Sequence, residues 1–519
     1  MSVFPPISCL TFLPLAGAVL VLFFGRRSAK LARGLSLAFA FLALAFALSL
    51  WHRFNPASGG MQFEEVHAWI PALGVQYHVG IDGLGLLMLV LSAIIVPMAM
   101  AASWRVQERV SLYYALILML EAGLFGTFSA LNFFHWFLFW ELSLIPAFFL
   151  IRLWGGTQRA TAATQFFLYT MAGSVALLLG FLAIYLATGK FDFMDVAALA
   201  RNGQLLPSIA AAFSWHSFSA EKIALILGFG VFLGFAVKVP LVPFHTWLPA
   251  AYAEAPTGTT MLLTGTMSKM GVYGFLRILL PIFGVQMRSV RTPLLWLAVA
   301  TIVLSAYAAV AQKDLKRIFA YSSINHLGYC MLGIFSILKF TGDDPRLLTE
   351  KAAALSGVLL QMFNHGLTAA TLFWFVALLE KRSGGLRGLN DFGGLRKVAP
   401  VFCGLMGIAL FSSLGLPGLN GFVGEFLIFK GSFPLAIWPT SVSVLGLLLT
   451  AIFILTILQR VFSGPLQEKW AGMPDLSTGE RLALLPALGL MFVLGVYPQL
   501  VLGVVNNTVL HIVQQLSFR

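Results

Sequence analysis

The stretch FLGFAVKVPLVPFHTWLP, residues 232–249, places a lysine and several prolines inside an apolar run. Lys238 lies within it, and Pro240 and Pro243 follow closely. Because proline removes a backbone donor and clashes with the preceding turn, a helix opens at such a point. Open backbone at membrane depth is tolerated only where it is buried in protein or lines a water-filled cavity. The stretch therefore predicts a broken membrane helix with a buried lysine at the break.

The composition of the whole chain indicates a protein that lies in a lipid bilayer. Of its 519 residues, 59% are hydrophobic and only 10% are charged, whereas soluble domains have about 25% charged residues. The mean hydropathy is +0.89. So few charges cannot cover several water-soluble domains, which excludes a soluble enzyme and a nucleic-acid-binding protein. The net charge of +13 fits short cytoplasmic loops rich in Lys and Arg.

Apolar runs of membrane-spanning length recur along the chain. A helix needs about 20 apolar residues to cross a hydrocarbon layer of roughly 30 Å. Fourteen such runs predict an all-α, polytopic membrane protein. They lie near residues 5–24, 31–51, 81–103, 110–130, 133–152, 163–187, 222–247, 259–281, 292–312, 317–339, 353–380, 399–430, 441–462 and 481–504. The first run is predicted to stay as an uncleaved anchor, because Arg26 and Arg27 follow it.

The basic residues of the loops predict the orientation of the chain. Counted over alternate loops, nineteen of the 33 Lys and Arg residues fall on one side, eleven on the other, and three inside spans. Cytoplasmic loops carry the excess of basic residues. We therefore expect both termini on the outer, periplasmic side of a bacterial inner membrane.

A second helix break is predicted in GLPGLNGFVGEF, where Pro417, Gly418 and Gly421 precede Glu425. Paired broken helices are typical of transporters built from inverted repeats. We therefore expect two inverted five-helix repeats, each with a broken helix in fourth place. The expected organisation is three N-terminal helices in 1–109, a first repeat in 110–282, a second, inverted repeat in 283–463, and a last transmembrane helix with a tail in 464–519.

Ionisable residues inside membrane spans cost about 2.5–3.5 kcal/mol on insertion scales and usually mark ion or proton paths. The ones that stand out inside the predicted spans are Glu121, Glu141, Lys238, Lys269 and Glu425. A membrane lysine often extends to the headgroups, but Lys238 and Lys269 lie about eight or more residues from either helix end, too far to reach them. A purely structural ion pair, for example between Glu141 and Lys238, is the other alternative.

Polar side chains form a stripe between these charges. Gln361, His365 and Thr368 share one helical face, His326 lies in the preceding span, and His245 ends the broken seventh span. A helical histidine is often only a satisfied core residue. In line with buried lysines, however, these three histidines are predicted to relay protons, since histidine titrates near neutrality.

Cysteine usage and short motifs argue against a metal or redox site on this chain. Cys9, Cys330 and Cys403 are far apart, and no CxxC, HExxH, P-loop or GxGxxG motif occurs. We expect no cofactor and no metal here, so any redox energy would have to arrive from other chains.

Seven segments, taken in order, resemble signatures of one known family, the antiporter-like membrane subunits of proton-pumping NADH:quinone oxidoreductase (respiratory complex I). They are IDG at 81–83, WELSLIP at 140–146, KVPLVPFHTWLPAAYAEAPT at 238–257, SKMGVYGFLR at 268–277, YSSINHLGY at 321–329, FNHGLTAATLF at 363–373 and GLPGLNGFVGEF at 415–426. The resemblance covers nearly the whole chain and is densest from about 115 to 430.

The resemblance implies a role for each buried charge. It implies that Glu141 pairs with Lys238, that Lys269 connects inward along the membrane midplane, and that Glu425 stands at the far exit beside the next subunit. The histidines 245, 326 and 365 would belong to a hydrated central axis. The chain would be a subunit of an enzyme complex without a redox centre of its own. Its partners would be other membrane subunits, including neighbouring antiporter-like ones, with FMN, iron–sulfur clusters and quinone on partner chains.

The chain departs from the family pattern in one loop. After HTWLP the family usually has Asp-Ala-His, whereas Ala250 and Tyr252 replace the acid and the imidazole here. This casts doubt on proton uptake through that loop, and it keeps open a subunit of a Mrp-type Na⁺/H⁺ exchanger, a membrane-bound hydrogenase or an inorganic-carbon uptake complex. A stand-alone solute transporter is less favoured, because no further cluster of solute-binding groups is evident.

Overall fold

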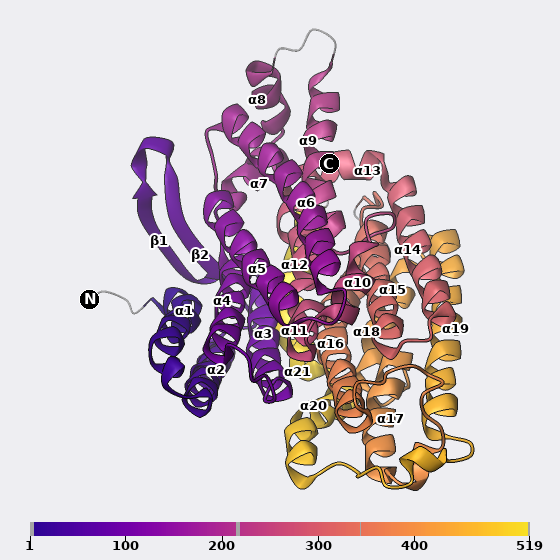
Figure 1. Ribbon diagram of the computed structural model, residues 1–519. Coiled ribbons are helices and arrows are strands. Elements are labelled where there is room, and N and C mark those ends of the chain that lie inside the picture. The colour runs from indigo at the N-terminus through magenta and orange to yellow at the C-terminus, as the bar shows by residue number, and fades with distance from the viewer. Residues whose placement is uncertain (1–4, 214–217, 343, 517–519) are drawn as a thin grey trace.

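The computed structural model describes residues 5–213, 218–342 and 344–516 and shows a bundle of long, packed helices (Figure 1). Within these residues, twelve helical segments are long and apolar enough to cross a membrane. They are α1 (Pro6–Phe24), α2 (Ala29–Arg53), α3 (Gly83–Ala102), α4 (Val110–Ser129), α5 (Phe133–Trp154), α6 (Arg159–Thr188), α9 (Ala220–Lys238), the composite segment Thr257–Ser289, α14 (Arg291–Ala311), α16 (Pro345–Ser383), α19 (Ile437–Ile457) and α20 (Thr478–Val496). The predicted all-α, polytopic class is confirmed.

The two remaining apolar runs of the sequence are helical as well. The run near 317–339 forms α15 (Leu315–Ser336), and the run near 399–430 forms α17 (Pro400–Leu414) and α18 (Asn420–Ser432). Neither belongs to the twelve segments, so the number of fourteen crossings stays a prediction. The division of the second run into two helices is the break that its prolines and glycines predict.

The predicted break after Lys238 is present in the structure. Helix α9 ends at Lys238, residues 239–246 are not helical, and α10 (Trp247–Glu254) then begins. The opened backbone finds partners on neighbouring elements: Val242 N donates to Thr301 Oγ1 of α14 over 3.1 Å. Such bonds replace the helical ones that the prolines remove, which allows irregular backbone at membrane depth.

The composite segment Thr257–Ser289 contains two π-helical turns around Lys269. It consists of α11 (Thr257–Leu262), the π turn Leu263–Met267, α12 (Lys269–Gly274), the π turn Phe275–Leu279 and α13 (Leu280–Ser289). Ser268 N donates to Leu263 O over 3.1 Å, five residues back, as a π turn requires. Such turns are rare in proteins and frequent at functional sites.

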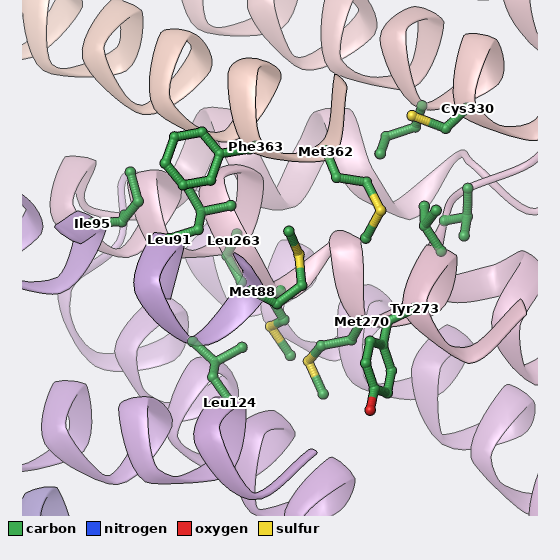
Figure 2. Packing of buried hydrophobic residues seen from close by; sticks show 14 of the residues in the cluster. Met88, Leu91, Ile95, Leu124, Leu263, Met270, Tyr273, Cys330, Met362 and Phe363 are labelled. Atoms are coloured by element: carbon green, nitrogen blue, oxygen red, sulfur yellow. The ribbon is translucent and has the colours of Figure 1, made fainter. Parts of the chain in front are cut away.

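The core of the bundle lies next to this segment. In the most apolar 18-residue stretch of α3, α4, α16 and the composite segment, 83–94% of the residues are buried. Figure 2 shows Met88 of α3, Met270 of α12 and Met362 of α16 in one apolar cluster. Methionine suits such a place, because its flexible chain fills irregular gaps. A polar side chain in this region therefore needs partners of its own.

A β-hairpin, which the predicted fold class does not include, covers one end of the bundle together with two short helices (Figure 1). The elements are β1 (Gln62–Ile70), β2 (Val75–Ile81), α7 (Phe193–Arg201) and α8 (Leu205–Ala212). His78 of β2 joins the hairpin to α7. Its Nδ1 contacts the side chain of Asp192, which caps α7, and its Nε2 lies 3.3 Å from Glu64 Oε2 on β1.

Both ends of the described chain lie at this hairpin end. Ile7 N at the start of α1 donates to Glu65 Oε1 over 2.6 Å. At the other terminus, Gly83 N donates to Thr508 Oγ1 of α21 (Gln499–Gln515) over 3.0 Å. Since Glu65 belongs to β1 and Gly83 follows β2, the first and last helices meet the same end of the bundle.

The hairpin contact is expected to depend on pH. Burial alone would lower the pKa of His78, but the hydrogen bonds and charges of Asp192 and Glu64 raise it above its ordinary value. Protonated His78 therefore stabilises the hairpin fully below its unfolded-state pKa of about 6.5. This stabilisation is lost as the pH rises through the higher pKa that His78 has in the folded protein. Hydrogen–deuterium exchange of residues 62–81, corrected for intrinsic rates, should show lower protection at about pH 8.5 than at about pH 6.

The His78→Gln variant should remove this difference, whereas His67→Gln, on the exposed face of the same hairpin, should retain it. Equal protection of the native hairpin at both pH values would contradict the prediction.

Candidate functional site

Four of the residues singled out in the sequence form one line through the protein interior. Lys269 is fully buried; its Nζ donates to Thr264 O and lies 2.7 Å from His365 Nδ1. The rings of His365 and His326 have centroids 5.1 Å apart. His326 Nδ1 in turn lies 3.1 Å from Glu425 Oε1. The line therefore joins α12, α16, α15 and α18.

A small polar cavity accompanies this line. Its lining includes His326, Gln361, His365, Thr368 and Glu425, and its volume is ≈ 10 Å³. That space accommodates about one water molecule, and its polar lining offers the partners that a buried water requires. Gln361 Nε2 lies 3.3 Å from His326 Nδ1 and 3.5 Å from Glu425 Oε1. The amide group of Gln361 therefore contacts both partners of the His326–Glu425 pair.

The break between α17 and α18 lets Glu425 reach the line. Gly415 ends α17 with φ +81°, and a Cβ built on it would lie 2.5 Å from Glu425 Oε2. Gly421 approaches Ser412 O so closely that a Cβ there would meet it at 1.9 Å. Gly421 is therefore required by its contact with backbone, and Gly415 by its positive φ.

Three polar residues that the sequence analysis did not select, Asn364, Ser412 and Asn420, hold the broken helix in place together with Thr368. Ser412 Oγ donates to Asn420 Oδ1 over 2.5 Å, and Thr368 Oγ1 lies 2.9 Å from Ser412 Oγ. Asn364 Nδ2 donates to Asn420 O over 2.6 Å. These bonds connect α16, α17 and α18. The signal in the sequence was the amide Asn420 directly at a proline–glycine break.

Lys238 and Glu141 lie near one another but are not in direct contact. Lys238 is 3% exposed, and its Nζ lies over the Trp140 ring, 4.8 Å from the centroid. Among the ion pairs of the described residues, none within 4.0 Å joins Lys238 to Glu141, and Glu141 Oε1 is buried without a hydrogen-bond partner. The direct pair implied by the resemblance is therefore not formed here, and an aromatic ring takes its place.

Two predicted residues lie apart from the line. Glu121 of α4 is fully buried, and neither carboxylate oxygen has a partner among the described residues. His245 lies in the open segment after α9, with a buried Nδ1 that has no partner in the described part of the chain. Glu121 thus lies inside the bundle and His245 is partly exposed, and neither is joined to His365 or His326 among the described residues.

Lys238 and Lys269 come from helices in close contact. A Cβ on Gly271 of α12 would lie 2.6 Å from the Val239 side chain and 3.0 Å from Phe235 O, so α12 packs directly against the end of α9. No hydrogen bond between the two lysines occurs within the described residues. Tyr252, which stands where the family usually has histidine, is fully buried, and its ring packs against that of Phe373.

The described residues contain no group of three or more His, Cys, Asp or Glu side chains that could hold a metal ion. The groups that lie in the line are lysine, histidine and glutamate side chains on adjoining helices, all of which can bind and release protons.

A family model described as NADH:quinone oxidoreductase/Mrp antiporter, transmembrane, matches residues 130–453. The matched range contains Glu141, Lys238, Lys269 and the three histidines. The chain belongs to this family. The resemblance drawn from the motifs is confirmed.

Similar proteins extend the match over the full length. A NADH-quinone oxidoreductase subunit M of Rhodobacter capsulatus is 35% identical over 513 residues, covering 98% of this chain and 96% of that protein. A chain of respiratory complex I from Thermus thermophilus has 27% identity and a TM-score of 0.83, covering 98% and 99% of the two chains. A chain of the Mrp complex from Dietzia sp. DQ12-45-1b, at 21% identity and TM-score 0.80, covers the same shares and shares the fold.

The Gly415→Ala variant is expected to separate Glu425 from His326. The new Cβ would collide with the carboxylate and place a non-glycine residue at positive φ, which costs about 1–3 kcal/mol of stability. A structure of the variant should show the two side chains beyond hydrogen-bond distance, with a lowered unfolding temperature.

Gly404→Ala in the same helix is the matched control, because a Cβ there meets nothing within 4 Å. An unchanged His326–Glu425 contact in Gly415→Ala would show that the glycine is not needed for it.

Proposed function

We propose that this chain is the M-type, proton-translocating membrane subunit of a NADH:quinone oxidoreductase. The observation that carries the proposal is the continuous line from Lys269 through His365 and His326 to Glu425 in a member of this family. Its partners are the other membrane subunits of the complex, including neighbouring antiporter-like ones. FMN, iron–sulfur clusters and quinone belong to partner subunits, and electron transfer there drives proton movement here.

Proton transfer follows the order of contacts in the line. Lys269 Nζ gives a proton to His365 Nδ1, 2.7 Å away. A water in the ≈ 10 Å³ cavity carries a proton from the His365 ring to His326. His326 releases a proton from Nδ1 to Glu425 Oε1, 3.1 Å away, and Glu425 passes it outward. Each imidazole accepts at one nitrogen and donates from the other.

Lys238 and Glu141 form the loading part of the path. Glu141 moves toward or away from Lys238, and this motion switches Lys238 between holding its proton and passing it to Lys269. Moving one charge across 100 mV requires about 2.3 kcal/mol, or roughly 4 kcal/mol at about 180 mV. This corresponds to a change of roughly three pKa units between loading and release. A rigid arrangement cannot supply such a change, so the distance between the two charges must vary, and Trp140 lies where it can control that distance.

Glu121 and His245 complete the proposed path as proton-exchanging groups outside the contact line. Glu121 is buried without a partner and serves as a reserve acceptor on the α4 side. His245 lies in the open segment after Lys238, where uptake from the cytoplasmic end would pass. Both assignments rest on burial and chemistry.

The two broken helices support the proposed division into inverted repeats, residues 110–282 and 283–463, each with its break in the fourth helix. The location of both chain ends beside the hairpin, together with the excess of basic loops at the opposite end, supports periplasmic termini in a bacterial inner membrane.

The Glu141→Gln variant should abolish proton pumping while the protein still inserts and assembles. The amide has nearly the same shape but cannot carry the charge that acts on Lys238. Vesicles that contain the complex should oxidise NADH with a ferricyanide acceptor at the native rate, while NADH-driven acidification falls at least about tenfold.

Glu221→Gln, an exposed carboxylate in the first turn of α9, is the control and should pump normally. A native number of protons per electron in Glu141→Gln would remove the proposed loading step.

The His326→Gln variant should interrupt the line at its centre. Glutamine keeps hydrogen-bonding capacity but does not titrate, so pumping should fall by about tenfold or more, while Tyr321→Phe on the same helix stays native. If His326→Gln pumps as well as Tyr321→Phe, the proton takes another route.

A subunit of a Mrp-type exchanger is the second candidate, favoured by the absence of the usual Asp and His at Ala250 and Tyr252. The identity of the chains that co-purify with this one distinguishes the two candidates. NADH oxidation by the purified assembly supports the first candidate, and sodium-dependent proton exchange without redox activity supports the second.

A further inference from the structure

Three buried polar residues lie between Lys269 and the hairpin end of the bundle, outside the line that leads to Glu425. Tyr273 and Arg277 follow Lys269 in the composite segment, and Asp82 follows the last residue of β2. At 1.5 Å per residue, Arg277 lies about 12 Å beyond Lys269. Tyr273, Arg277 and Asp82 are 1%, 9% and 2% exposed. They are called the hairpin-side cluster below.

Hydrogen bonds join the hairpin-side cluster from one end to the other. Arg277 Nε donates to Tyr273 Oη over 3.4 Å, and Arg277 Nη2 donates to Asp82 Oδ1 in an ion pair. The same oxygen of Asp82 accepts from Gly85 N over 3.0 Å and caps α3. The guanidinium group therefore lies between the tyrosine hydroxyl and the carboxylate, and it ties the composite segment to the start of α3.

The hydroxyl group of Tyr273 directs its proton to a backbone carbonyl. Tyr273 Oη donates to Phe128 O over 3.1 Å, and the two rings pack edge to face with centroids 5.3 Å apart. Figure 2 shows this hydroxyl pointing away from Met362. A backbone carbonyl accepts a hydrogen bond but has no proton of its own to release. A proton transferred toward Phe128 would therefore go no further.

Arg277 cannot pass a proton on either. A proton moves along hydrogen bonds only if each group accepts one proton and releases another. The guanidinium group has five N–H donors and no acceptor, and it stays protonated in proteins, whereas a lysine can lose its proton in a buried site. The path from Lys269 past Tyr273 therefore ends at a group that only donates.

The orientation of the ion pair adds an electrostatic barrier. Its positive member contacts Tyr273, on the side of Lys269, and its negative member, Asp82, lies on the side of the hairpin. A fixed positive charge in a low-dielectric interior repels a proton that approaches it. Arginine side chains exclude protons and cations from membrane pores by the same effect.

We propose that the Asp82–Arg277 pair, together with Tyr273, closes the direct way for protons between Lys269 and the hairpin end of the protein. A proton on Lys269 then moves to His365 Nδ1, 2.7 Å from Nζ, and so along the line instead of straight outward. This inference rests on the proposed function, because it requires that protons reach Lys269. Arg277 acts by offering no acceptor, and it needs no movement to do so.

The test replaces Arg277 by side chains that can accept and release a proton. Arg277→Lys keeps a positive charge beside Asp82 but can lose its proton, and Arg277→His can accept at one nitrogen and donate from the other. Arg201→Lys, which changes an exposed arginine at the end of α7, is the matched control. Vesicles that contain the whole complex are given a pH gradient without NADH, and the decay of the gradient is measured.

The gradient should decay about tenfold faster with Arg277→Lys and Arg277→His than with the native complex. Arg201→Lys should decay at the native rate. Native gel electrophoresis should show full assembly of every variant. The added leak should disappear in the double variant Lys269→Met, Arg277→Lys, because protons would have to pass through Lys269.

A native rate of decay in both assembled Arg277 variants would overturn the inference and would leave the ion pair a purely structural contact. A leak that persists in the double variant would also overturn it, because the leak would then come from disturbed packing. The proposed function fails on a different reading: native vesicles would not acidify when NADH is added, whatever the rate of passive decay.

Discussion

The high cost of an isolated charge in a low-dielectric layer is the constraint on which this structure depends. Each buried ionisable group in the line meets it by contacting the next: Lys269 rests on a backbone carbonyl and on His365, and His326 rests on Glu425. The side chains that stabilise these buried groups are themselves proton donors and acceptors. The contacts that stabilise the buried groups are therefore the same ones that form the proposed proton path.

The same constraint explains why the helices are broken where they are. A broken helix exposes backbone groups that lipid cannot satisfy, so side chains must do so: Trp247 Nε1 donates to Val237 O over 3.1 Å, and Val242 N donates to Thr301. At the break between α17 and α18, the side chains of Ser412 and Asn420 form the corresponding hydrogen bonds. The π turns on either side of Lys269 change the hydrogen-bond pattern of the helix without breaking the helix.

The sequence predicted the membrane segments well, because a bilayer imposes one simple rule, about 20 apolar residues for each crossing. It also identified the costly charges, and Lys269, His326, His365 and Glu425 proved to be neighbours. Features that depend on three-dimensional geometry could not be predicted from the sequence. They are the contact of Lys238 with the Trp140 ring, the π turns around Lys269, and the bonds of His78 to Asp192 and Glu64.

The size of the small cavity beside the His326–Glu425 contact bears on the proposed transport of protons. Its ≈ 10 Å³ admits about one water. A metal cation such as sodium travels with a shell of several oxygen ligands and would need a much wider passage. A proton needs no volume, because it advances by exchange of bonds along molecules already present. If the proposed path runs through this cavity, its size favours the exchange of protons over the passage of a hydrated metal cation, and smaller side chains at Gln361 or Thr368 would weaken that preference.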